Sequence, residues 1–345
     1  MDRRVAPRPF QQDRGKSRRL RKALRPVNPT SRALTSSLHI SDLFAFDIAS
    51  VSLLGWLAVA SLLAYLAGAI SLWVRGRSWT VPGTISFVIG CAAWFVATGL
   101  GVNAHANELI TALIFQQLTL LVAAPPLLLM GSPGTLLLRT VPHRGPGRLV
   151  LRAAIAAQRS RVARVLLHPS VAIIVAIVAF PGLYFTDAVS SVLAVPGGHQ
   201  TLLVALLVFG VIGGAPLWAL DPLPRKPSFS VRLVGAFLEL QVHALFGLVL
   251  LRSASGMLSW YSQEPEGWGI SRALDQSLSG SLVWTYGQLP LLIVLIVTLS
   301  KWRKSDMRFA RHRRPAEDAA LDEYNAYLAE VAAQDSRQPN QKGSA

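Results

Sequence analysis

The sequence contains one cysteine, Cys91, among 345 residues. A single thiol can form neither an intrachain disulfide nor a Cys-rich metal or redox motif, so thiol-based copper chaperones and thioredoxin-like reductants are excluded. The chain also lacks a GxSxG nucleophile motif, a glycine-rich phosphate loop and an HExxH zinc motif. These absences predict that the protein is not an enzyme.

Charged residues are scarce, at 15% of the chain, whereas hydrophobic residues make up 52%. A mean hydropathy of +0.41 excludes a disordered chain, and long uncharged runs exclude a basic protein that binds nucleic acid along one charged groove. A helix needs about 20 apolar residues to cross the hydrocarbon core of a bilayer. The sequence therefore predicts an all-α polytopic membrane protein, a seven-helix transmembrane bundle with short soluble tails. The predicted spans are 49–74, 81–101, 109–131, 168–187, 200–220, 233–258 and 280–300.

Three regions follow from this pattern: a basic arm (1–48), the seven-span domain (49–300) and a tail (301–345) with a short amphipathic helix at 316–334. The third span should be kinked or broken at Pro125-Pro126, because proline removes a backbone N–H and clashes with the preceding turn. No internal repeat is present, which counts against an inverted-repeat transporter.

Basic residues fall on alternate connections. The connection 132–167 holds seven Arg and no acid, and 75–80, 222–232 and the start of the tail are also basic. The other connections, 102–108, 188–199 and 259–279, carry few basic residues. The positive-inside rule therefore predicts a plasma membrane protein with its carboxy terminus in the cytoplasm and, for seven spans, its amino terminus outside.

The amino-terminal arm is a poor match to this orientation. Residues 1–32 contain eleven Lys or Arg against two Asp. We expect this arm to be attracted to anionic lipid head groups, and the uncharged or acidic stretch 33–48 beside the first span to permit an outside location.

Ionisable groups inside a bilayer are costly, so each is a candidate functional residue. Glu239 and His243 lie four residues apart in the sixth span, on one face of a helix and within mutual reach. The carboxylate would orient the imidazole at a metal or proton site. The alternative is a buried hydrogen-bonded pair that fixes helix packing.

Further metal-binding side chains lie at the predicted outer ends of the spans. They are His105, His199, Met257 and Asp275. Imidazole and thioether groups suit copper, especially Cu(I), and carboxylates act as hard ligands or orient other ligands. No HxxxH, HxH or MxxM cluster accompanies them. They are predicted to lie at a similar depth in the membrane, but they do not form a known metal-binding sequence motif.

Several segments, taken in order, resemble the CtaG-like family of membrane-integral assembly factors for caa-type cytochrome c oxidases. They are LLVAAPPLLLMGSPGTLLLR (120–139), LLHPSVA (166–172), His199, PLWALDPLP (216–224), HALFGLVLL (243–251) and DQSLSGSLVW (275–284). The resemblance covers about residues 45–305. It implies a seven-helix protein required to make active haem–copper oxidase in the respiratory chain, with a role in supplying copper.

The sequence departs from the family where two histidines four residues apart are common, before the APP segment. Leu113 and Gln117 occupy these positions. His199, His243 and Asp275 match family positions and remain the predicted metal ligands, whereas Glu239, His105 and Met257 are auxiliary candidates.

Three hypotheses result. In the first, the protein helps to assemble cytochrome c oxidase at the outer face of the membrane, with a copper ion held transiently by His199 and His243. In the second, it is a copper-independent structural partner of the oxidase. In the third, it is a proton-coupled transporter of a small solute that uses Glu239 and His243 as a relay.

Overall fold

The structure is a computed structural model and describes residues 39–142, 144–218, 227–253, 258–265 and 267–337. The chain divides into two compact units, residues 40–265 with 270–345, and residues 1–39 with 266–269. In the smaller unit only His39 and residues 267–269 are described, and 267–268 form a turn. The basic arm 1–32 and Met257 therefore lie outside the described residues.

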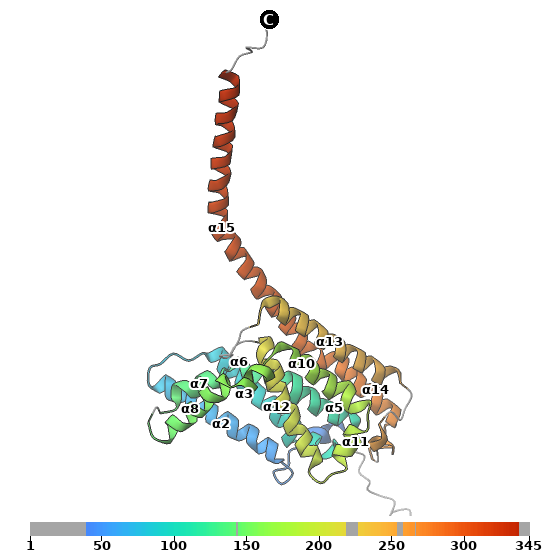
Figure 1. The fold of residues 1–345 in the computed structure, drawn as a ribbon. Helices are drawn as coiled ribbons and strands as arrows, with labels where there is room; N and C mark the ends of the chain where they lie inside the picture. The colour runs from blue at the N-terminus through green and yellow to red at the C-terminus, as the bar shows by residue number, and fades with distance from the viewer. Residues whose placement is uncertain (1–38, 143, 219–226, 254–257, 266, 338–345) are drawn as a thin grey trace, which may run out of the picture. The chain divides into compact units, whose positions relative to one another are not determined.

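All regular elements of the larger unit, within the described residues, are helical (Figure 1). This confirms the predicted all-α class. The helices are η2 (Ile40–Phe44), α2 (Leu53–Val74), α3 (Val81–Gly99), α4 (Gly101–His105), α5 (Ile110–Leu118), η3 (Thr119–Ala123), α6 (Ala124–Met130), α7 (Pro133–Thr140), α8 (Pro146–Arg159), α9 (Arg161–Leu166), α10 (Pro169–Ile177), η4 (Val178–Gly182), α11 (Ala188–Leu193), α12 (Gly198–Trp218), α13 (Phe229–Arg252), η5 (Ser259–Tyr261), α14 (Arg272–Leu282), η6 (Val283–Gly287) and α15 (Leu289–Arg337).

Six helical segments of the described chain are long and apolar enough to cross a membrane. They correspond to six of the seven predicted spans and make the protein a multi-pass membrane protein. The segment predicted at 168–187 contains a shorter apolar helix, Pro169–Gly182, so the count of seven is not confirmed. The third segment, Ile110–Met130, is central, since 78% of its apolar window is buried, compared with 22% for α2.

Serine side chains begin several of these helices. Ser52, Ser228 and Ser271 accept hydrogen bonds from the backbone N–H three residues later, at the starts of α2, α13 and α14. Such a cap satisfies one of the four N–H groups that a helix leaves free at its start.

The predicted break in the third segment is a π-helical turn. Within η3 the helix widens immediately before Pro125 and Pro126 and then continues as α6. The two other π-turns in the described part of the chain also lie near proline, since η4 contains Pro181 and η6 precedes Pro290. A wider turn gives room to the proline ring and frees backbone groups that side chains can satisfy.

Two predicted boundaries in the carboxy-terminal part are wrong. The last segment begins at Arg272 rather than 280, because the charged residues at its start are paired. The tail helix predicted at 316–334 is not a separate short helix, because α15 runs without a break from Leu289 to Arg337.

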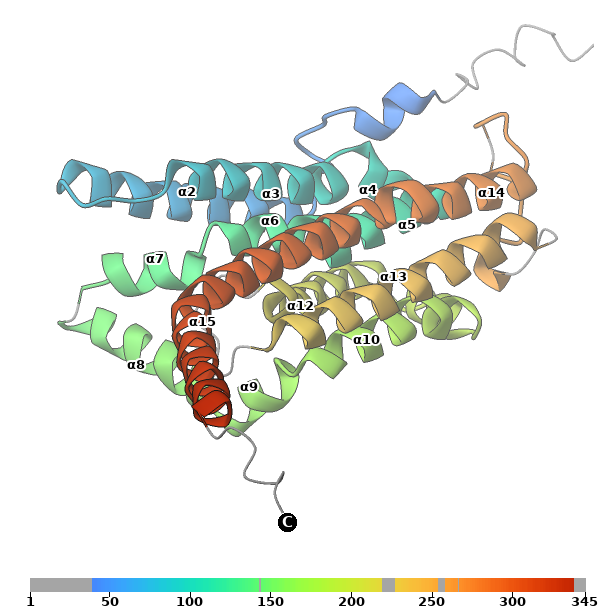
Figure 2. The same cartoon turned by 90° about the horizontal axis from the view of Figure 1, so that it is seen from above.

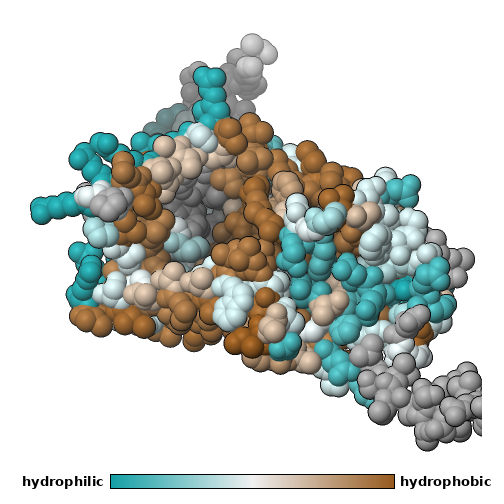
Figure 3. Space-filling model, turned by 90° about the horizontal axis from the view of Figure 1, so that it is seen from below, coloured by the Kyte–Doolittle hydropathy of each residue, from teal (hydrophilic) through white to brown (hydrophobic). Residues whose placement is uncertain are grey.

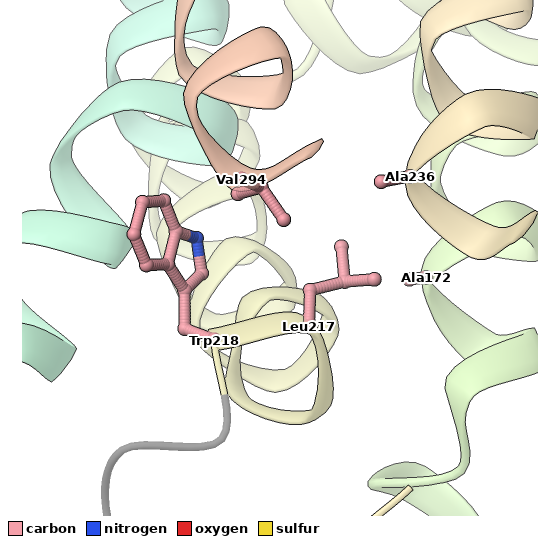
Figure 4. Packing of buried hydrophobic residues seen from close by; sticks show 5 residues of the cluster. All are labelled: Ala172, Leu217, Trp218, Ala236 and Val294. Atoms are coloured by element: carbon pink, nitrogen blue, oxygen red, sulfur yellow. The ribbon is translucent and has the colours of Figure 1, made fainter. Parts of the chain in front are cut away.

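Apolar residues from four segments meet at one end of the bundle. Leu217 and Trp218 of α12 pack with single residues from α10, α13 and α15 (Figure 4). The partners are Ala172, Ala236 and Val294. Leu217 and Trp218 end α12 and precede the basic connection, so this is the end predicted to face the cytoplasm, which we call the inner end. The opposite end, with η5 and the start of α14, is called the outer end.

The surface of the larger unit has the pattern expected for lipid contact. Hydrophobic residues form a broad and partly hollowed zone on the face seen in Figure 3, and hydrophilic residues gather beside it. Large side chains such as Leu57, Ile85 and Leu245 are exposed on the spanning helices, where only lipid would cover them.

Candidate functional site

The outer end is held together by one carboxylate. Asp275 of α14 is fully buried and accepts hydrogen bonds from the backbone N–H groups of Ile110 at 2.8 Å and Thr111 at 3.0 Å. The Thr111 hydroxyl donates to the same carboxylate at 2.7 Å, and Arg272 donates to it at 2.8 Å. Asp275 therefore caps the start of α5 from another helix, where a negative charge also meets the positive end of the helix dipole.

Arg272 extends this network to the outer loops. Its guanidinium donates to the carbonyl oxygens of Glu108 at 2.9 Å and of Gln263 at 3.0 Å. It also lies over the ring of Tyr261, 5.3 Å from the centroid. The Tyr261 hydroxyl donates to the carbonyl oxygen of Ala106. Arg272, Asp275 and Tyr261 thus join two connections that are far apart in the sequence, the one between α4 and α5 and the one that precedes α14.

Burial raises the pKa of the Tyr261 hydroxyl well above its ordinary value of 10.0. Tyr184 and the Asp275 carboxylate raise it further, and Arg272 opposes them. The phenol therefore stays neutral and keeps its role as a donor.

A second polar cluster lies around Gln116, which is fully buried in α5. His199 donates through Nε2 to the Gln116 side-chain oxygen at 2.8 Å. The Gln116 amide nitrogen donates to the carbonyl oxygen of Ala97 at 2.7 Å and to Asn103 at 3.3 Å. His199 is therefore tied by hydrogen bonding to a glutamine that links it to α3 and α4.

Gln117, the next residue of α5, makes hydrogen bonds to the segment that contains η4. Its amide nitrogen donates to the carbonyl oxygen of Ala179 in η4 at 2.7 Å, and its side-chain oxygen accepts from the Tyr184 hydroxyl at 2.8 Å. The carbonyl of Ala179 belongs to a π-turn and lacks the regular α-helical geometry. Gln117 thus links α5 to η4 and to Tyr184 by hydrogen bonds.

His243 of α13 is fully buried, and neither ring nitrogen makes a hydrogen bond. The ring packs edge-on against Phe180, with 4.3 Å between ring centroids. A buried imidazole without a partner is unusual, which keeps His243 a candidate for ligand binding.

Glu239 lies one turn earlier in α13. Its Oε2 atom is buried and has no hydrogen-bond partner, so the predicted pairing with His243 is not formed through this atom. Glu239 lines a cavity of about 20 Å³ with Gly210, Gly213 and Trp218 of α12. This volume is close to that of one water molecule, and the carboxylate is the polar group that would receive it.

Two further residues that the sequence analysis names lie elsewhere in the described part of the bundle. His105 pairs through Nδ1 with Glu108 at 3.1 Å. Leu113 is fully buried as part of the apolar core of α5.

Copper, which the family resemblance implies, needs several nitrogen or sulfur ligands directed to one point. The described residues contain no group of three or more His, Cys, Asp or Glu side chains that could hold a metal ion. The Nε2 atom of His199 is bonded to Gln116, and both Asp275 oxygens are bonded to protein donors. The side chains in the described part of the chain therefore do not fit a bound copper ion.

Sequence reasoning missed four structural residues of these clusters: Arg272, Tyr261, Gln116 and, at the inner end, Arg232. A signal existed for the two arginines, because an arginine at the edge of an apolar run is costly unless it is paired. No such signal exists for Gln116, because nothing in the local pattern names its partners.

Most of this bundle matches the model of a known protein family. The model of the cytochrome c oxidase caa3 assembly factor family (Caa3_CtaG) matches residues 63–305. The chain belongs to this family. The match covers the larger part of the chain, including all of the polar clusters described above.

Three mycobacterial proteins are also similar. The uncharacterized proteins Mb0105 of Mycobacterium bovis and MT0111 of Mycobacterium tuberculosis are each 31% identical over 288 residues, which is 81% of this chain and 44% of theirs. The uncharacterized protein ML1998 of Mycobacterium leprae is 27% identical over the same lengths. This chain thus spans less than half the length of these relatives. No solved structure matches it significantly.

Proposed function

We propose that this protein is an assembly factor for cytochrome c oxidase that acts at the outer face of the plasma membrane. It binds an oxidase subunit there while that subunit is incomplete, and it catalyses no reaction. Membership of the Caa3_CtaG family is the observation that carries the proposal.

The proposal includes seven membrane crossings, with the carboxy terminus inside and the amino terminus outside. Six crossings are the six long segments described above. The remaining one, fourth along the chain, is α10 with η4. Ala172 near its start packs in the inner-end cluster, and Asp187 just beyond it accepts a hydrogen bond from Ser259 of η5 at 3.4 Å. With the apolar residues 183–185 that follow it, this segment reaches the lower limit of about 17 residues for a helix that spans a membrane.

The outer end offers apolar side chains for a protein partner. Phe185, Val195, Trp260 and Leu274 are exposed on the loops and helix starts of this end. Trp260 is held in place, because its indole N–H donates to the carbonyl oxygen of Asn107 at 3.3 Å. Fixed aromatic side chains at a surface are typical anchors of protein interfaces.

The partner role is tested in a strain that lacks the gene and carries variants of it. We expect deletion to lower oxidase activity without lowering synthesis of the oxidase subunits, and Trp260→Ala combined with Val195→Ser to reproduce part of that loss. A matched control is Trp302→Ala, an exposed tryptophan of α15 at the other end. Normal oxidase activity in the deletion strain would refute the proposal.

Copper binding is the alternative to a copper-independent role, and it has its own test. His243 supports it, because both of its ring nitrogens are without a hydrogen-bond partner. Elemental analysis of the purified protein, wild type against His199→Ala with His243→Ala, decides it. The side chains that could bind copper, described above, favour the copper-independent role. For that role we expect no copper above background in either protein. We also expect normal oxidase activity in a strain that carries the double variant.

A further inference from the structure

The segment between the third and fourth predicted spans is an uncovered amphipathic helix pair, α8 and α9. Of those apolar side chains of the pair whose burial the structure describes, only Leu151 is buried. Leu149, Val150, Ile155, Val162 and Val165 are exposed, and their exposed fractions reach 68% at Leu149. Among described residues, α9 is the only helix against which α8 packs to more than a marginal extent.

The arginines of α8 form a narrow stripe. Arg148, Arg152 and Arg159 are separated by four and seven residues, which places them within about 40° of one another around the helix axis. Val150, Ala154 and Ala157 lie on the opposite face. Arg161 and Arg164 continue the charge in α9, one turn apart, after Ser160 caps that helix through the N–H of Ala163.

The position of this pair is fixed at both ends by the bundle. The preceding helix α7 packs along α2, where Arg139 donates to the carbonyl oxygen of Ser78 and lies 5.8 Å from the ring of Trp79. The following helix α10 carries Ala172 into the inner-end cluster. Figures 1 and 2 show α7 and α8 at the same end of the bundle as the turn that joins α2 to α3, and in Figure 2 α7 lies between that turn and α8. The pair therefore lies at the inner end, where the spanning helices meet the membrane surface.

The charge of the segment indicates what covers it. Residues 132–167 contain seven Arg and no acid, so a protein partner would have to supply several carboxylates, whereas an anionic leaflet supplies phosphates at every position. A stripe of arginines on a helix whose other side chains are mostly apolar is also typical of helices that lie in the plane of the membrane interface. Arginine stems extend along the apolar region while the guanidinium groups reach the phosphates.

We propose that α8 and α9 lie in the headgroup region of the inner leaflet and bind anionic phospholipids through Arg148, Arg152 and Arg159. The inference uses the proposed orientation of the protein, but it is independent of the oxidase. The test below measures lipid contact in purified protein, so its failure would leave the assembly role unaffected.

The single cysteine makes a site-specific test practical. Cys91 is buried, so Cys91→Ala gives a background in which Val150→Cys can be spin-labelled alone. The full-length protein is reconstituted into nanodiscs of phosphatidylcholine, or of phosphatidylcholine and phosphatidylglycerol at about 3:1. Collision of the label with oxygen, which enters lipid, is compared with collision with a water-soluble nickel complex.

We expect the Val150 label to collide with oxygen rather than nickel, and phosphatidylglycerol to strengthen this preference. Each arginine near an anionic surface should contribute roughly fivefold to the partition of the helix. Arg148→Gln, Arg152→Gln and Arg159→Gln together should abolish the effect of phosphatidylglycerol. The matched control removes the same charge from α15, by Lys301→Gln, Arg303→Gln and Lys304→Gln, and should retain it.

Two results would overturn the proposal. A label that collides mainly with nickel in both lipids would place α8 in water. A label protected from both reagents would show that protein, either a second copy or another chain, covers the helix.

Discussion

The carboxylate of Asp275 accepts a hydrogen bond from the backbone N–H of Ile110, 165 positions earlier in the chain. Ile110 is the first residue of α5. The residue before it, Leu109, has no side chain that can cap a helix. The cap that α5 lacks locally is thus supplied by α14. This one contact orders the central helix of the bundle relative to the last one.

Asp275→Asn should destabilise the protein strongly. The amide keeps one acceptor oxygen but loses the charge, which leaves Arg272 buried without its ion-pair partner. Breaking such a pair by removing one member costs about 3–5 kcal/mol. Thermal unfolding of the detergent-purified protein measures the change, and Asp187→Asn, at a less buried carboxylate of the same end, is the control that should change little. An unchanged transition for Asp275→Asn would show that the carboxylate is not the cap.

The inner end has a corresponding cap of opposite charge. Arg232 of α13 donates through Nε to the carbonyl oxygen of Leu217 at 2.6 Å and through a terminal nitrogen to that of Trp218 at 3.4 Å. It also donates to the Thr298 hydroxyl at 3.2 Å. The guanidinium therefore satisfies carbonyl groups that α12 leaves free at its end, where positive charge is favoured.

Arg232→Lys should not preserve this contact, although it preserves the charge. An ammonium group cannot reproduce the planar fork that reaches two carbonyls and a hydroxyl from one side chain. We expect a loss of about 1–3 kcal/mol in the free energy of unfolding. Arg252→Lys, at the exposed other end of the same helix, should be neutral in the same unfolding assay. Equal stability of both variants would contradict the capping role.

Local pattern predicted the spanning helices but not these contacts. The apolar runs of α2, α3 and α12 are recognisable because lipid exposure and burial both demand hydrophobic side chains over the length of a bilayer. The family resemblance predicts Asp275 as a metal ligand, but the sequence does not show that its carboxylate caps α5, because the backbone N–H of Ile110 is 165 positions away. The start of α14 at Arg272 was missed for the same reason, since its charges are acceptable only because they pair.

The π-turns also show that the local sequence does not predict contacts between helices. Pro125 and Pro126 predicted a break in the third span, and the structure has one, but the sequence did not specify a π-turn. It also did not show that Gln117 would satisfy a carbonyl of another π-turn, η4, since that pairing depends on how the two helices pack.

Gln117→Leu should therefore be costly, even though leucine suits the interior of a membrane protein. The variant removes the donor to Ala179 and the acceptor for Tyr184, and each buried group left unpaired costs about 1–3 kcal/mol. Gln241→Leu on α13 is the matched control, because Gln241 is exposed on the helix surface. Thermal unfolding of the two variants should differ clearly, and combining Gln117→Leu with Tyr184→Phe should recover part of the loss. Without that recovery the hydrogen bond to Tyr184 would not be the cause.

Tyr261 predicts how stability changes at alkaline pH. Its pKa is raised in the folded protein, mainly by burial, so folding favours the protonated phenol. The stabilisation from this group is complete below the ordinary pKa of about 10. Above that value the unfolded chain gains free energy by releasing the proton, and the stabilisation is lost as the pH rises toward the folded pKa.

Tyr261→Phe should lower the free energy of unfolding by about 1 kcal/mol at pH 7, because the hydrogen bond to Ala106 is lost. The deficit should shrink as the pH is raised from 9 to about 11, because phenylalanine cannot ionise. Unfolding temperatures measured over this range, with Tyr327→Phe at an exposed position of α15 as the control, test the prediction. A deficit that stays constant with pH would show that the phenol of Tyr261 is not held in its neutral form by the fold.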